Sequence, residues 1–227
     1  EGFIRRAITS WSANPSLEIL GNPDADRLSI VSFVVKHAGQ YLHHNFVVAV
    51  LNDLFGIQSR GGCSCAGPYG HALLGIDDEH SAEISHEVGL GCEGIKPGWI
   101  RVNFNYFISD AVFEFITEAV NLVAAHGWKL LPWYRFDVTT AEWIHVDSTG
   151  DAPFSLFDIS YEEGSLQHSE RPAHVPESEL AGYLDNARAL FDSIDPTTGP
   201  SQPPVEATAS FEDLRWFLLS EDVRTGE

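Results

Sequence analysis

The sequence predicts an α+β fold, a two-layer domain in which one mostly antiparallel sheet carries helices packed on one face. Two observations lead to this prediction. Short segments rich in β-branched and aromatic residues alternate with longer segments whose apolar residues recur at helical spacing. The chain also has 227 residues, of which 44% are hydrophobic, and that is enough to bury a substantial core. The expected order is strand, helix, strand, long loop, helix, strand, helix, hairpin and helix.

The first part of the chain is expected to supply a helix end, two strands, a second helix and a short third strand. Residues 3–11 indicate the end of a helix, which Ser-Ala-Asn-Pro terminates. Residues 17–20 predict a short strand, closed by a turn rich in Gly, Pro and Asp. Residues 27–35 are typical of a buried strand. Residues 41–56 have helical spacing and end on a C-cap glycine, and residues 57–60 predict a short strand.

The middle of the chain adds two helices, a strand and a hairpin. Residues 77–89 predict a polar helix, and residues 96–104 predict a turn followed by a strand. Residues 109–127 open on a serine N-cap, place apolar side chains on one face and end on glycine, so they predict an amphipathic helix. Residues 130–138 and 141–147 flank two threonines and predict a hairpin.

The last part of the chain predicts two more helices separated by a linker. Residues 176–194 have the spacing of an amphipathic helix, residues 195–210 are rich in proline, and residues 211–220 predict a terminal helix. We therefore expect one domain over residues 1–195, followed over residues 196–227 by the linker and the terminal helix.

The charge of the chain disfavours two classes of partner. The formal net charge is −20, from 33 acidic and 13 basic residues. Such a surface repels phosphate backbones and anionic lipids, so we expect neither nucleic acid nor a membrane as a partner. Three cysteines without a framework spacing fit a reducing cytosol, and we expect a cytoplasmic protein. The chain contains no methionine, even at its first position, so we expect it to be processed or to be a piece of a longer chain.

The segment "SRGGCSCAGPYGH" (residues 59–71) holds two of the three cysteines, and it leaves several interpretations open. Cys63, Cys65, His71 and Cys92 offer soft ligands for zinc, although a Cys-x-Cys pair lacks the usual spacing. A disulfide between two cysteines so close together would close a strained ring. The thiols can also pack as small apolar groups. A reactive thiol needs a nearby cation to lower its pKa, and an arginine precedes the cysteines.

Three stretches carry a resemblance to a known family: "SIVSFVV", "FGIQSRGGCSCAGPYG" and "KPGWIRVNFNYFISDAVFEFITEAV". In this order they resemble the C-terminal region of class V aminotransferases, the group that includes cysteine desulfurases and selenocysteine lyases. The resemblance runs from about residue 27 to residue 147. It implies the small C-terminal domain of a fold-type I enzyme that depends on pyridoxal phosphate (PLP). It also implies an amino-acid substrate and a homodimer when the enzyme is intact.

The resemblance assigns roles to three residues. Cys65 lies five residues after Arg60 and resembles the sulfur-accepting nucleophile of the desulfurases. Arg101 resembles the arginine that grips the substrate α-carboxylate, and Arg60 resembles a second active-site arginine. A surface ion pair at a strand end is the alternative for Arg101. Family desulfurases often have histidines before the nucleophile, whereas this chain has Cys63 and Ser64, so transamination and lyase chemistry both stay open.

The lysines and histidines receive structural interpretations. None of Lys36, Lys96 and Lys129 lies in the sequence context of a cofactor lysine. The resemblance implies that this lysine lies in a missing N-terminal PLP-binding domain, so the chain alone should bind PLP weakly and catalyse nothing. His43 and His44 begin a predicted helix, where we expect a solvated or capping role. The alternative function is a non-catalytic interaction or assembly domain that retains the fold.

Overall fold

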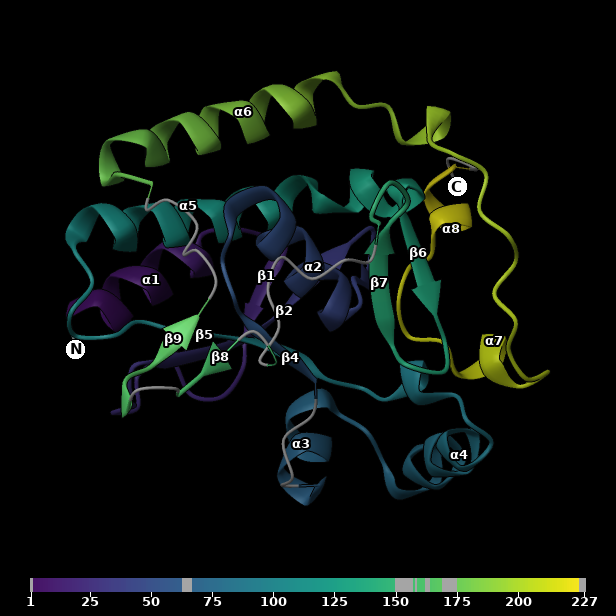
Figure 1. The fold of residues 1–227 in the computed structure, drawn as a ribbon. Helices are drawn as coiled ribbons and strands as arrows, with labels where there is room; N and C mark the ends of the chain where they lie inside the picture. The colour runs from purple at the N-terminus through teal and green to yellow at the C-terminus, as the bar shows by residue number, and fades with distance from the viewer. Residues whose placement is uncertain are drawn as a thin grey trace.

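The main sheet is antiparallel and forms the centre of an α+β fold, as predicted (Figure 1). The computed structural model describes residues 2–62, 67–149, 157, 159–161, 164–168 and 175–224. The strand order is β1 (Leu17–Ile19), β2 (Ile30–His37), β5 (Trp99–Asn103) and β4 (Arg60–Gly62), and β3 (Gln40–Tyr41) pairs with the end of β2. Because every pairing is antiparallel, short connections can join neighbouring strands.

Four helices cover one face of this sheet. Helices α1 (Gly2–Ser12), α2 (His44–Phe55) and α5 (Asp110–His126) pack on the strands, and α6 (Leu180–Ser193) lies outside them, against α5 and α2 (Figure 1). Their apolar stripes and the inner face of the sheet form the main hydrophobic core. This layer matches the predicted helical face.

The helix ends follow the capping residues that the sequence offers. In α5, the Ser109 hydroxyl accepts a hydrogen bond from the Val112 amide, as expected of an N-cap. The α2 helix ends at Gly56, whose φ of 65° is left-handed, so a side chain there would be strained. The polar helix α4 (Asp78–Gly89) begins after Asp77, whose side chain accepts a hydrogen bond from the His80 backbone amide.

Two predicted elements differ from the structure. The short strand begins at Arg60 rather than at residue 57, because the Ile57 amide still bonds the Leu51 carbonyl in the cap of α2. The predicted terminal helix is interrupted: the chain is helical over α7 (Phe211–Leu214), extended through residues 215–219, and helical again over α8 (Ser220–Arg224). Phe217, Leu218 and Leu219 are all buried, and a helix would bury only one stripe of such a run.

The C-terminal strap, residues 208–224, belongs to the same core as the sheet. Phe217 forms a parallel bridge with Tyr41, and the Leu218 amide donates to the Tyr41 carbonyl. Thr208 and Ser210, at the start of the strap, both donate hydroxyl hydrogen bonds to the buried carboxylate of Glu87 on α4. These hydroxyls lower the pKa of the Glu87 carboxyl, Ser210 most strongly, so the carboxylate stays ionised and holds the strap.

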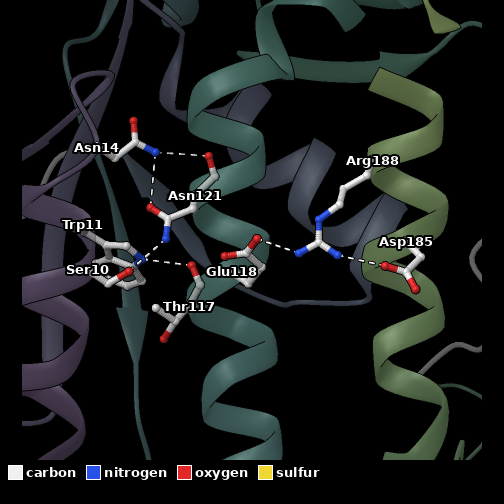
Figure 2. Close-up of polar contacts among 8 residues, drawn as sticks. All are labelled: Ser10, Trp11, Asn14, Thr117, Glu118, Asn121, Asp185 and Arg188. Carbon is white, nitrogen blue, oxygen red and sulfur yellow. Dashed lines mark hydrogen bonds and ion pairs between the residues drawn. The ribbon is translucent and has the colours of Figure 1, made fainter. Parts of the chain in front are cut away.

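Buried and half-buried polar contacts fasten the first helix and the turn after it to α5 (Figure 2). Asn121 donates to the Ser10 hydroxyl at 2.9 Å and accepts from the Asn14 amide at 3.2 Å. The Trp11 indole donates to an α5 backbone carbonyl at 3.1 Å. On the other side of α5, Arg188 of α6 pairs with a glutamate (Figure 2). Helix α5 is therefore fixed from both sides by directional contacts as well as by its apolar face.

The remaining elements surround these layers. The predicted hairpin is confirmed as β6 (Tyr134–Asp137) and β7 (Glu142–His145). Helix α3 (Gly67–Leu74) follows the cysteine segment, which is therefore not a loop throughout, since β4 and α3 occupy its two ends. The short elements are β8 (Ile159–Ser160) and β9 (Gln167–His168) and the 3-10 helices Glu93–Ile95, Gly127–Trp133, Glu177–Glu179 and Pro196–Thr198.

Candidate anion-binding site

The two arginines that the resemblance singled out are direct neighbours on the main sheet. The β4–β5 register pairs Arg60 with Arg101, and the β2–β5 register pairs Arg101 with Ser32. Directly opposed residues of antiparallel strands project to the same face and start about 5 Å apart at Cβ. Ser32, Arg101 and Arg60 therefore form one row across three strands.

This row lies on the face of the sheet that turns away from α1, α2 and α5, here called the outer face. One end of the outer face is covered, because Leu73 and Leu74 of α3 pack on Val34 and Trp99 (Figure 1). At the other end, which carries the arginine row, Arg60 is exposed, Arg101 is half-buried and Ile30 beside them is 42% exposed. Helix α3 is thus an addition to the predicted layers.

Two of the three guanidinium nitrogens of Arg101 are buried without a partner among the described residues. Its Nε and Nη2 atoms are inaccessible to solvent, and no described residue hydrogen-bonds them; the same holds for the hydroxyl of Ser59 next to Arg60. In the rest of the described chain, Arg6, Arg188 and Arg215 all form ion pairs. Arg5, Arg27 and Arg135 have no ion pair among the described residues either, so what distinguishes Arg101 is that two of its guanidinium nitrogens are buried without a partner. The alternative interpretation of Arg101, a surface ion pair, has no support among the described residues, none of which pairs with it.

A cavity of about 690 Å³ opens at this arginine row. Its described lining residues include both arginines, Asn103 and Asn105, and no carboxylate. Its apolar wall consists of Phe55, Ile57, Val112, Phe115, Ile116 and Leu180, which come mostly from α2, α5 and α6, so the cavity lies at the edge of the sheet, where β4 is the last strand. Its size lies within the range of small-molecule sites, and its chemistry suits an anion with an apolar portion.

A second cavity of about 780 Å³ lies between the β6–β7 hairpin and the proline-rich segment. It differs from the first in charge, because Asp137, Glu206 and Glu221 line it together with Arg135 and Arg224. Arg224 donates to two backbone carbonyls of the proline-rich segment at 2.7 Å, so this guanidinium is already engaged. Arg135 has no ion pair among the described residues, but the three carboxylates of this lining would repel an anion, so the second cavity suits an anion less well than the first.

The cysteine predictions are only partly placed by the structure. Cys63 and Cys65 lie outside the described residues, between the end of β4 and the start of α3. Cys92 is buried, and its sulfur lies 3.9 Å from the Thr208 hydroxyl of the C-terminal strap. His71 instead lies near Ser81, with 3.5 Å between Nε2 and Oγ. In the described part of the chain, no group of three or more His, Cys, Asp or Glu side chains is arranged to hold a metal.

The lysines do not fit the role of a PLP lysine. Lys36 pairs with Glu18, and Lys96 pairs with Glu93. Lys129 donates to a backbone carbonyl at 2.7 Å. None of the three lines the arginine cavity, so among the described residues that cavity has no lysine amine in its lining.

A buried histidine pair next to β4 was not foreseen as such from the sequence. His43 caps α2 through Nδ1, which accepts from the Asn45 amide, and its Nε2 lies 3.2 Å from the Gly94 carbonyl. The expected capping role is therefore confirmed for His43, whereas a solvated role is wrong for both histidines, which are buried. Trp216 of the C-terminal strap stacks on both rings. The pattern His-His before an apolar helical run was the available signal.

Burial keeps these two histidines neutral. It lowers the pKa of His44 to about 4, and it lowers the pKa of His43 further below its ordinary value, where the neighbouring His44 adds repulsion. The His44 ring also lies close to Gly98, which precedes β5, and Gly98 lies close to the end of β4. A Cβ on Gly98 would lie 2.8 Å from His44 Cε1 and 2.7 Å from the Gly62 carbonyl carbon. Glycine at position 98 therefore permits the close approach that holds β4 in place.

Comparisons with known proteins add no assignment: no family model and no curated protein matches the chain. Within the described residues, no helix is long and apolar enough to cross a membrane.

Proposed function

We propose that this chain is the C-terminal domain of a PLP-dependent enzyme of the class V aminotransferase type, acting on an amino acid. The observation that carries the proposal is that two guanidinium nitrogens of Arg101 are buried without a described partner, beside Arg60 at a cavity. A guanidinium can make two parallel hydrogen bonds to a carboxylate, and each charge-assisted bond contributes about 1.5–3 kcal/mol. Every amino acid offers such a carboxylate.

In this proposal the residues of the chain bind and orient the substrate. Arg101 holds the α-carboxylate, Arg60 adds a second positive charge, and the apolar wall shields the bound molecule from water. PLP, when bound, supplies the electron sink for chemistry at the α-carbon. Its lysine would come from a preceding domain, since the three lysines here are engaged elsewhere, and the intact enzyme would be a homodimer.

Cys65 remains the proposed thiol of a desulfurase or selenocysteine lyase. It follows β4, the strand of Arg60, in the sequence. In an intact enzyme of that type, Cys65→Ala would abolish sulfur release from cysteine while Cys63→Ala would do much less. If both variants keep full activity, the enzyme is an aminotransferase and neither thiol takes part in its reaction.

An interaction or assembly domain is the second candidate, and a specific feature favours it. Tyr106 and Phe107, in the connection between β5 and α5, are 96% and 71% exposed, and Leu28 before β2 is 80% exposed. All three lie near the start of β2 and the end of β5, close to the arginine row. Exposed apolar side chains gathered in this way suit a surface that another domain or subunit covers.

Binding and labelling of the chain test the proposal together. We expect weak binding of L-alanine that is lost in Arg101→Gln and retained in Arg135→Gln, a matched control because Arg135 is an exposed strand arginine outside the cavity. Incubation with PLP and reduction with borohydride should label none of Lys36, Lys96 and Lys129 stoichiometrically. L-alanine binding that ignores Arg101, or stoichiometric labelling of one lysine, would overturn the proposal.

A further inference from the structure

The arginine pair carries more positive charge than one carboxylate can neutralise. Arg60 and Arg101 are directly opposed in register, and like charges placed so are destabilising. Neither has an ion-pair partner among the described residues, although the chain has 33 acidic residues. A bound monoanion would leave one of the two charges uncompensated, whereas a molecule with two anionic groups would match both.

The surroundings of the pair also suit a second negative charge. The neutral polar side chains at the cavity are Gln58, Ser59, Asn103 and Asn105, and its described lining residues include no carboxylate that would repel an anion. The remainder of the protein is strongly acidic and repels dianions at long range, so the selection of a dianion must be local.

The two arginines differ in depth, which gives the site a direction. Arg101 has buried guanidinium atoms without a partner, whereas Arg60 is exposed. A buried cation gains more from an anion than an exposed one, because water screens it less. The α-carboxylate common to all amino acids therefore belongs at Arg101, and a distal anionic group belongs at Arg60, nearer to solvent.

We infer that the site selects an amino acid that carries a second anionic group on its side chain, a carboxylate or a phosphate. This inference rests on the proposed function and narrows its substrate class. Arg60 is then the residue that determines specificity for the distal group, while Arg101 serves every substrate alike. A neutral amide or hydroxyl in place of the distal group leaves Arg60 without its partner.

Isosteric amino-acid pairs test this inference on the chain itself. Calorimetric or NMR titration would compare L-aspartate with L-asparagine, and O-phospho-L-serine with L-serine, at one fixed ionic strength. We expect at least one anionic member to bind about tenfold or more tightly than its neutral isostere, as the loss of one charge-assisted bond implies. The two pairs together distinguish a dicarboxylic from a phosphorylated substrate.

Three variants separate this inference from the proposed function. Arg60→Gln should remove the preference for the anionic member and retain the weak binding of L-asparagine, Arg101→Gln should weaken binding of all four amino acids, and Arg135→Gln should change nothing. Equal binding within both pairs, or a preference that survives Arg60→Gln, would overturn the inference. If binding in that case still depended on Arg101, the proposed function would stand. Absence of any Arg101-dependent binding would overturn both. Thermal unfolding of each variant verifies that the fold is intact.

Discussion

Phe33 and Ser32 are neighbours on β2, but they project to opposite faces of the main sheet. On the inner face, Phe33 is fully buried among the helices, and Ile100 of β5 is 1% exposed. On the outer face, Ser32 begins the row that leads to Arg101 and Arg60. Alternate residues of the same strands thus supply the core on one side and unpaired cations on the other. The packed inner face therefore fixes the strands that carry Ser32, Arg101 and Arg60, while these outer-face side chains contribute little to the stability of the fold.

The largest effect is expected for the inner face. Phe33→Ala should lower the free energy of unfolding by about 3–5 kcal/mol, because it removes a fully buried aromatic ring and leaves a cavity. Urea or guanidinium denaturation measures this change. Ser32→Ala, one residue away on the outer face, is the control and should stay within about 0.5 kcal/mol. Comparable losses in both variants would contradict the division between the faces.

The next effect concerns the buried histidines beneath β4. The folded pKa of His44, about 4, lies below the unfolded value of 6.5, so the unfolded chain binds more protons over this range. Its contribution to stability is therefore complete above pH 6.5 and is lost as the pH falls toward 4, by about 3 kcal/mol. Unfolding measured against pH in the wild type and in His44→Phe isolates this slope. Identical slopes in the two proteins would show that His44 does not titrate in this way.

A smaller loss of stability is expected when a side chain is added at Gly98, where the start of β5 approaches the end of β4 closely. Gly98→Ala places a Cβ 2.7 Å from the Gly62 carbonyl carbon, which is backbone and cannot rotate away. We expect a loss of about 1–3 kcal/mol and weaker anion binding, since β4 must shift from β5. Gly182→Ala is the matched control, because a Cβ there meets no atom within 4 Å, and it should be neutral or slightly stabilising. An unchanged stability of Gly98→Ala would contradict the close approach.

The smallest change in the free energy of unfolding is expected at Arg101, the residue whose replacement should weaken ligand binding most. Arg101→Gln should leave the free energy of unfolding unchanged or raise it by up to about 1 kcal/mol, because it removes one of two opposed like charges. The same denaturation assay measures it. A loss of several kcal/mol would show that the fold itself needs the guanidinium, and the contrast between the two faces would then be weaker.

Local sequence patterns predicted most helices and strands, but they could not predict which distant segments pair with each other. The N-cap at Ser109 and the C-cap at Gly56 depend on nearby residues, and both are confirmed. The start of β4 was missed by three residues because the α2 cap extends to Ile57, which depends on backbone hydrogen bonds that spacing does not encode.

The candidate site shows the same limit. The resemblance selected Arg60 and Arg101, but their direct opposition depends on the register of β4 against β5, and that register depends on the close approach at Gly98. The burial of His43 and His44 depends on Trp216, from the opposite end of the chain. A terminal helix was predicted there because the sequence alone does not reveal that Phe217 pairs with Tyr41.

The C-terminal strap also determines when this domain can finish folding during synthesis. Phe211, Phe217 and Leu218 are among the last described residues to leave the ribosome, yet they complete a core that begins with Ile4 and Trp11. Contacts between such distant segments form slowly, because a long stretch of chain must close first. Until the strap arrives, Tyr41 and the histidine pair lack their cover. A nascent chain in that interval exposes apolar surface and is open to chaperones and to aggregation.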